Sequence, residues 1–276
     1  MAIPWTRIAA LTAALIGGVV VVMSFENSLL YFPVRALASS PEAHGLRADA
    51  LSVPTEDGET LAGWWIRGAG RRALLFFHGN AGNAADRLDR ARILNGRFGL
   101  DVFLVDYRGY GGSTGSPSEE GLGRDARAIY RTARERGFAA DGIVLFGESL
   151  GSAVAARLAS ELPAGAVILE TPFLSIRAMA KEHYPWVPVF LIRSRFDNAR
   201  RVASIAAPKL FLVAERDEIV PPEHGRRLYA LASAPKTLYL IPGARHNDTY
   251  TTGGEGYWRA VSEFLAASAA GAVSGR

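Results

Sequence analysis

The chain has 276 residues, of which 49% are hydrophobic and none is cysteine. This composition excludes a disordered chain, and the missing cysteine excludes disulfide bonds, thiol nucleophiles and cysteine-ligated metals. The formal net charge of +4 is small and the basic residues are scattered, so nothing in the sequence favours binding to nucleic acid.

An uncharged apolar run, residues 8–23, lies close to the amino terminus. It is slightly shorter than the roughly 20 residues of a membrane-spanning helix, but the two residues after it can extend it. A cleaved signal peptide is the alternative, although the one triplet that resembles a cleavage site lies well beyond the run. We therefore expect a single-pass N-terminal membrane anchor over 1–26. Arg7 before the run and Glu26 after it favour the non-cytoplasmic side for the rest of the chain.

After this run the sequence alternates between short apolar strand patterns and longer helical patterns. Two strands, at 46–53 and 60–67, flank a turn and predict an antiparallel pair. Helical patterns separate most of the later strands, which is typical of a parallel sheet with helices on both faces. We expect one α/β domain over 27–271 with a mostly parallel eight-stranded sheet, and a tail at 272–276. The six later strands are expected at 73–77, 102–106, 143–146, 167–169, 209–214 and 237–241.

The strand at 143–146 leads into Gly147-Glu148-Ser149-Leu150-Gly151 and then into a helical run of small residues. A G-x-S-x-G sequence between a strand and a helix is typical of a nucleophile elbow, which holds the serine hydroxyl clear of the sheet. The same pattern recurs at 111–115, but no helix begins at its serine. We therefore interpret Ser113 as a loop residue and Ser149 as the nucleophile.

Two backbone N–H groups are expected to bind the negative charge that develops during acyl transfer. One belongs to Leu150, at the start of the helix that follows the elbow. The other should come from the loop after the third strand, where Asn80 is the candidate. His78 and Gly79 precede it and are expected to support this loop rather than to react.

The segment 172–200 interrupts the alternation of strands and helices. It is rich in large apolar residues and contains two internal prolines. An ordinary connecting helix is one interpretation. We favour a small helical lid, because an apolar insertion at the strand ends suits an acyl-chain pocket or a membrane contact. Phe173, Tyr184 and Trp186 are the candidate substrate-binding residues.

A serine hydroxyl needs a base to take its proton and an acid to orient that base. In this kind of site the chain order is serine, then acid, then histidine. His246 alone among the five histidines follows the last strand, so we predict it to be the base. Asp217 follows the penultimate strand and is the predicted acid. Three other carboxylates remain as alternatives: Glu215, Glu218 and, farther away, Asp197.

Motifs spread over residues 30–265 occur in the same order in a known family. They are found at 76–83, 105–111, 147–151, 173–177, 217–222 and 246–249. On these residues the sequence resembles the membrane-anchored α/β hydrolases of the bud-emergence type, with the α/β-hydrolase-domain-containing proteins thirteen and seventeen among their relatives. The resemblance implies an α/β-hydrolase fold, an N-terminal anchor, a Ser149–Asp217–His246 triad and serine-hydrolase activity. The depalmitoylating relatives carry an N-terminal cysteine cluster, which this chain lacks.

We therefore expect a membrane-anchored serine hydrolase that cleaves a small acyl ester or an acylated substrate, as an ester or thioester, through an acyl-enzyme intermediate. The triad needs no cofactor, and no spacing such as H-E-x-x-H indicates a metal. Two alternatives stay open. One is a serine peptidase or a carbon–carbon bond hydrolase on the same triad. The other is a membrane-tethered binding protein with an idle triad.

Overall fold

The computed structural model describes residues 26–274, and the side chains of residues 26–270. The predicted membrane anchor at 1–26 therefore lies outside the described residues, except for Glu26. The predicted tail at 272–276 is described only in part, and without its side chains. Among the described residues, none of the helices combines the length and the apolar character that crossing a membrane requires.

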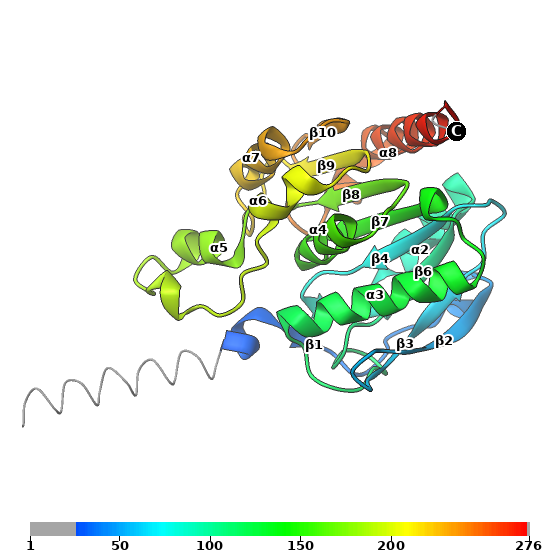
Figure 1. Ribbon diagram of the computed structural model, residues 1–276, viewed down its shortest axis with the longest axis horizontal. Coiled ribbons are helices and arrows are strands. Elements are labelled where there is room, and N and C mark those ends of the chain that lie inside the picture. The colour runs from blue at the N-terminus through cyan, green and yellow to red at the C-terminus, as the bar shows by residue number, and fades with distance from the viewer. Residues whose placement is uncertain (1–25, 275–276) are drawn as a thin grey trace, which may run out of the picture.

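A mixed sheet of eight strands, in the order β10-β9-β8-β7-β4-β6-β3-β2, forms the centre of the fold (Figure 1). The six strands from β10 to β6 are parallel, and β3 and β2 join them antiparallel. The strands are β2 (Ala48–Pro54), β3 (Thr60–Ile66), β4 (Ala73–Phe77), β6 (Asp101–Val105), β7 (Ile143–Glu148), β8 (Ala166–Glu170), β9 (Lys209–Ala214) and β10 (Lys236–Ile241). A separate two-stranded parallel pair consists of β1 (Phe32–Pro33) and β5 (Ala81–Gly82).

Helices cover both faces of the sheet, which explains why the central strands are apolar without alternation. The core on one face includes residues of α3, α4 and α7, and the core on the other includes residues of α2 and α8. The helices are α2 (Leu88–Phe98), α3 (Glu119–Glu135), α4 (Leu150–Glu161), α5 (Ile176–His183), α6 (Asn198–Arg201), α7 (Pro222–Leu231) and α8 (Thr249–Ser274). Short 3-10 turns are η1 (Glu42–His44), η2 (Ala84–Arg87), η3 (Ala140–Gly142), η4 (Val189–Leu191) and η5 (Val202–Ser204).

The predicted lid, residues 172–200, leaves the sheet after β8 and returns before β9. It contains α5 and η4, and α6 begins at its end. In Figure 1, α5 and the loop that follows it stand away from the sheet, at the same end of the molecule as the blue helical turn at 26–30. None of the residues of α5 is fully buried.

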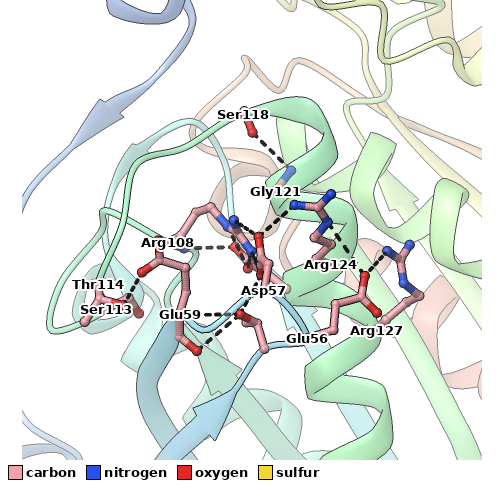
Figure 2. Close-up of polar contacts among 12 residues, drawn as sticks. Glu56, Asp57, Glu59, Arg108, Ser113, Thr114, Ser118, Gly121, Arg124 and Arg127 are labelled. Carbon is pink, nitrogen blue, oxygen red and sulfur yellow. Dashed lines mark hydrogen bonds and ion pairs between the residues drawn. The ribbon is translucent and has the colours of Figure 1, made fainter.

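Ser113, the serine of the second G-x-S-x-G pattern, is fully buried in a loop. Its hydroxyl donates to the carbonyl of Asp106 and accepts from the N–H of Ala62, both at 2.9 Å. Nearby, Figure 2 shows the guanidinium of Arg108 between two carboxylates, one of them that of Asp57 in the β2–β3 turn. These contacts attach the loop to the β2–β3 pair, so Ser113 has a structural role there.

The C-terminal helix α8 contains a break. Helical structure begins at Thr249, and the chain breaks its helical conformation at Gly254, where φ is 49° and ψ is −137°. Glycine adopts such a positive φ without a steric penalty, which explains the break. The helical turn before this break begins at Thr249, which follows His246 by three residues.

Candidate active site

Ser149 lies at the sharp turn between β7 and α4 with a φ of 52° and a ψ of −114°. A side chain on either flanking glycine would collide with backbone. A Cβ at Gly147 would lie 2.2 Å from the carbonyl oxygen of Gly151, and one at Gly151 would lie 1.9 Å from that of Phe77. The N–H of Ser149 donates to the carbonyl of Glu170 at 2.9 Å, which attaches the turn to the end of β8. The two glycines thus make the strained serine conformation accessible.

Three side chains from separate strand ends form a hydrogen-bonded row. The Ser149 hydroxyl lies 2.9 Å from Nε2 of His246, and Nδ1 of His246 lies 2.8 Å from Oδ2 of Asp217. A carboxylate can only accept, so Nδ1 carries the proton, and Nε2 of the neutral ring accepts from the hydroxyl. His246 and Asp217 are both only 8% exposed.

The carboxylate of Asp217 is held in place from a second direction. Its Oδ1 accepts from the backbone N–H groups of Ile219 at 2.9 Å and Val220 at 2.7 Å. The alternative acids make other contacts. Glu215 accepts from the N–H of Gly243, Glu218 accepts from the N–H of His246 at 3.4 Å, and Asp197 caps the start of α6.

The two expected N–H donors lie close to the nucleophile. Leu150 is the first residue of α4, so its N–H has no partner within the helix. Asn80 and Leu150 line the same pocket as Ser149. The position of Asn80 is fixed by its carbonyl, which accepts from the hydroxyl of Tyr110 at 2.7 Å, and by its side-chain amide, which donates to the carbonyl of Leu30.

His78 is completely buried beneath the Asn80 loop and makes no contact with the serine–histidine–aspartate row. Its ring packs 4.3 Å from the ring of Tyr107, and its Nδ1 lies 2.8 Å from the carbonyl of Gly79. Burial lowers the pKa of His78 to about 3. A neutral, enclosed imidazole supports the loop and is not accessible to a substrate.

A buried group of charges lies next to the nucleophile turn. Glu148, directly before Ser149, lies 3.0 Å from a guanidinium nitrogen of Arg87 and 3.3 Å from one of Arg90. Burial alone would raise the pKa of Glu148, but the two arginines outweigh burial and hold the pKa below its ordinary value. Arg90 also lies 2.8 Å from Glu170, the last residue of β8.

Glu170 extends this group to the C-terminal helix. Its carboxylate accepts from the hydroxyl of Thr249 at 2.6 Å and from that of Tyr257. Thr249 follows His246 by three residues, and the N–H of Ser149 donates to the carbonyl of Glu170. Glu170 therefore connects the histidine loop to the nucleophile turn. Sequence reasoning missed this network. The only signal was a charged residue at the end of an otherwise apolar strand.

An apolar pocket of about 440 Å³ opens above Ser149. Phe173 and Tyr184, two of the three candidate substrate-binding residues, line it. Trp186, the third, is not among the residues that line the pocket, and its side chain is 75% exposed. The pocket lies within the usual size range of small-ligand sites. Further apolar lining residues are Leu29, Leu30, Ile176, Met179, Ala180 and Val220.

No group of three or more histidine or acidic side chains suited to a metal ion is found in the part of the chain that the structure describes.

Comparisons with known proteins agree on the family. A model described as serine aminopeptidase, S33, matches residues 68–199. Protein bem46 of Schizosaccharomyces pombe is 34% identical over 88% of this chain and 86% of its own length. The membrane protein YNL320W of Saccharomyces cerevisiae is 35% identical over 87% of this chain and 89% of its own, and its function is uncharacterised. A Mycobacterium tuberculosis protein, Rv2307c, also uncharacterised, is 37% identical over 97% of this chain and 96% of its own.

Among solved structures, the esterase Pf2001 of Pyrococcus furiosus superimposes with a TM-score of 0.72, at 21% identity. The match covers 86% of this chain and 97% of the esterase. At this identity the likeness concerns the fold, and it confirms the α/β-hydrolase fold expected from the sequence.

Proposed function

Since this chain belongs to the α/β-hydrolase family that includes bem46, we propose that it is a serine hydrolase that cleaves acyl esters or thioesters. The observation that carries this proposal is the hydrogen-bonded row Ser149–His246–Asp217, whose serine lines an apolar pocket. An apolar pocket beside a nucleophile suits an acyl chain, whose burial contributes about 0.8 kcal/mol per methylene group.

The geometry supports a two-step reaction. In the first step, Oγ of Ser149 attacks the acyl carbonyl carbon while Nε2 of His246 takes the hydroxyl proton. The oxyanion accepts hydrogen bonds from the N–H groups of Leu150 and Asn80. When the tetrahedral intermediate collapses, the bond to the leaving alcohol or thiol breaks, and His246 passes the proton to it. Asp217 orients the imidazole and stabilises its charged form.

Water completes the reaction. His246 takes a proton from a water molecule, which attacks the acyl group on Ser149. The second tetrahedral intermediate collapses to a free carboxylic acid, and the proton returns to the serine oxygen. Each step needs only groups that the site holds, together with substrate and water.

A serine peptidase is the second candidate, because the matching family model is described as a serine aminopeptidase. An aminopeptidase must bind a substrate ammonium group, for which a free carboxylate is suited. Among the described residues that line the pocket, Glu26 alone carries a carboxylate, and it already accepts from the N–H groups of Arg193 and Ser194. This occupancy favours acyl esters over peptides.

The proposal includes the N-terminal membrane anchor at 1–26, with the hydrolase domain on the non-cytoplasmic side. It is supported by the uncharged run at 8–23 and by the similarity to YNL320W, which is named a membrane protein. Extraction of cell membranes with alkaline carbonate tests the anchor, since an anchored chain stays in the pellet. Protease added to intact spheroplasts tests the side, because only an outward-facing domain is digested.

A fluorophosphonate probe tests the reaction. The parent should be labelled, whereas Ser149→Ala should not. Ser113→Ala, at the other G-x-S-x-G serine, should keep its labelling. Hydrolysis of p-nitrophenyl acyl esters compared with aminoacyl p-nitroanilides then separates the esterase from the peptidase. A folded parent that neither reacts with the probe nor turns over any ester would identify a binding protein with an idle triad.

A further inference from the structure

Large apolar side chains are exposed around the mouth of the pocket. Trp186 and Phe190, in the segment after α5, are 75% and 77% exposed, and Leu29 on the N-terminal helical turn is 66% exposed. Tyr184, at 50% exposure, lines the pocket and packs edge-on against Trp186, with 5.9 Å between ring centroids. Exposed clusters of this kind mark sites of contact with a protein, a ligand or a membrane. We call the surface formed by the three aromatic side chains and Leu29 the aromatic face.

Three basic residues follow Phe190 in the sequence. Arg193, Arg195 and Arg200 are exposed and line a polar hollow of about 840 Å³, to which Asn27 also contributes. Among the side chains that the structure describes, residues 26–270, none forms an ion pair with these three guanidinium groups; the arginine of the hollow that does have a partner is Arg201, with Glu119.

The acidic residues of this hollow are already engaged. Glu119 accepts from the N–H groups of Arg195 and Phe196. Asp197 accepts from the N–H of Arg200, and Glu120 is paired with Arg157 at 2.7 Å. Glu119 is also paired with Arg201 at 3.3 Å. Of the three acidic side chains that line the hollow, Asp197 alone lacks an ion pair among the described residues, whereas three arginines lack one. The hollow therefore carries net positive charge beside the aromatic face, and charge of this sign is complementary to anionic headgroups.

The chain enters the described structure at the same place. Glu26 accepts from the N–H groups of Arg193 at 3.0 Å and Ser194 at 2.7 Å, and Figure 1 shows the helical turn at 26–30 on the side of the molecule where α5 projects. In the sequence, the uncharged run 8–23 ends only three residues before Glu26. A bilayer that receives this run would lie close to the aromatic face.

We propose that the aromatic face and its basic rim dock on the surface of a bilayer that contains anionic lipids. Aromatic side chains beside arginines are the pattern that favours a membrane interface. Docked in this way, the pocket opens toward the bilayer, and an acyl chain reaches Ser149 without crossing water. This delivery of substrate rests on the proposed hydrolase function, whereas the docking does not.

Fluorescence quenching tests the docking on the full-length chain. The protein is reconstituted into vesicles of phosphatidylcholine and phosphatidylglycerol, with plain or brominated acyl chains, and tryptophan emission is recorded. Bromine quenches only tryptophans that reach the bilayer. In an anchored chain these include Trp5, so Trp186→Phe should lose a clear part, but not all, of the quenching. Trp258→Phe, which alters a residue only 5% exposed in the core, should lose none of it.

The charge requirement is tested in the same vesicles. Replacing phosphatidylglycerol by phosphatidylcholine should reduce the quenching of Trp186, and so should the pair Arg195→Ser and Arg200→Ser. Arg92→Ser, at an exposed site on α2, is the control. Equal quenching of the parent and Trp186→Phe would overturn the proposal, because the aromatic face would then be covered by residues 1–25 or by a second copy of the chain.

Activity separates docking from catalysis. Phe190→Ser should hydrolyse a short water-soluble ester within about twofold of the parent rate, but should lose roughly tenfold on a long-chain ester carried in the vesicles. An equal loss on both substrates would contradict delivery from the bilayer. Ser149→Ala should abolish both activities while keeping the quenching. A parent without activity on either ester would contradict the proposed hydrolase function but not the proposed docking.

Discussion

Single residues hold the candidate site in place through contacts with backbone. Ser149 keeps its positive φ because Gly147 and Gly151 have no side chains to collide with the backbone beside them. Asp217 faces Nδ1 of His246 while two N–H groups hold one of its oxygens. The roles of Asp217 and its neighbour Glu218 can be tested separately, because Asp217 contacts the ring of His246 and Glu218 contacts its backbone N–H.

Asp217→Asn tests the role of the acid. The amide would leave the fold intact but would favour the wrong imidazole tautomer, and an equivalent change in a serine protease lowers kcat by about 10⁴-fold. We expect a loss of this order in steady-state hydrolysis of a p-nitrophenyl ester, with little change in melting temperature. Glu218→Gln is the matched control and should lose less than about tenfold. If the two variants lost activity in the reverse order, Glu218 would be the acid.

At the scale of elements, η2 and α2 connect parts of the site that lie on different strands. Arg87, the last residue of η2, and Arg90, in the first turn of α2, lie beside Glu148 at the end of β7, and Arg90 also reaches Glu170 at the end of β8. Because Glu170 also binds the first turn of α8, the histidine loop and the nucleophile turn share one buried anchor.

Arg90→Gln should show how much stability this anchor contributes. Arg90 is 6% exposed, and its loss leaves the buried carboxylate of Glu170 without its ion-pair partner, a change that typically costs 3–5 kcal/mol, whereas Glu148 keeps Arg87. Urea unfolding followed by circular dichroism measures the free energy of unfolding. The control, Arg92→Gln, changes an exposed arginine on the same helix, for which we expect less than about 1 kcal/mol. Similar values for the two variants would show that the buried network is not an important source of stability.

Helix α5 forms one wall of the pocket, and this placement makes a prediction about chain length. Ala180 lines the pocket, so Ala180→Phe would fill part of the 440 Å³. We expect kcat/KM to fall roughly tenfold or more for long acyl esters and to stay nearly constant for acetyl esters. A series of p-nitrophenyl esters of graded length measures the effect. Lys181→Phe changes the exposed neighbour outside the lining and should leave the dependence of kcat/KM on acyl-chain length unchanged. An equal shift in this variant would mean that the pocket wall does not determine acyl-chain length.

At the scale of the whole molecule, the sheet buries ionisable groups whose titration affects global stability. Burial raises the pKa of Asp106, which is 1% exposed, from 3.8 to about 7. The folded protein keeps a proton on this carboxyl between about pH 4 and 7, which the unfolded chain releases, so the contribution to stability falls as pH rises through this window. His78 acts in the opposite direction. Its pKa is lowered to about 3, so its contribution is lost as pH falls below about 6.5.

Asp106→Asn tests the contribution of Asp106, whose carboxyl lies 3.6 Å from Nε2 of His78. The amide cannot ionise, and its oxygen can still accept from the N–H of Ala84, as Asp106 does at 2.8 Å. The variant should therefore gain stability relative to the parent, by a few kcal/mol, as pH rises from about 4 to 8. Urea unfolding at a series of pH values provides the measurement. Glu263→Gln, at an exposed carboxyl on α8, should show a nearly constant difference from the parent. A constant difference for Asp106→Asn as well would contradict the prediction.

The sequence alone indicated the order of strands and helices along the chain and the residues of the predicted triad, because each of these leaves a local signal. The resemblance to a known family implied the α/β-hydrolase fold. Buried parallel strands are short apolar runs, and a nucleophile turn requires glycines at fixed positions around its serine. The catalytic roles of Ser149, His246 and Asp217 remain predictions, although the structure places the three side chains within hydrogen-bonding distance.

Only the tertiary structure decided the features that depend on distant parts of the chain. It placed Ser113 in a structural loop contact, left Trp186 exposed and outside the lining of the pocket, and joined Arg90, Glu170 and Thr249 in one buried group. It also brought Glu26 beside Arg193, which lies 167 residues later in the chain. Contacts between residues so far apart have no periodic pattern in the sequence, because they arise only when the folded sheet brings strand ends and loops to the same edge.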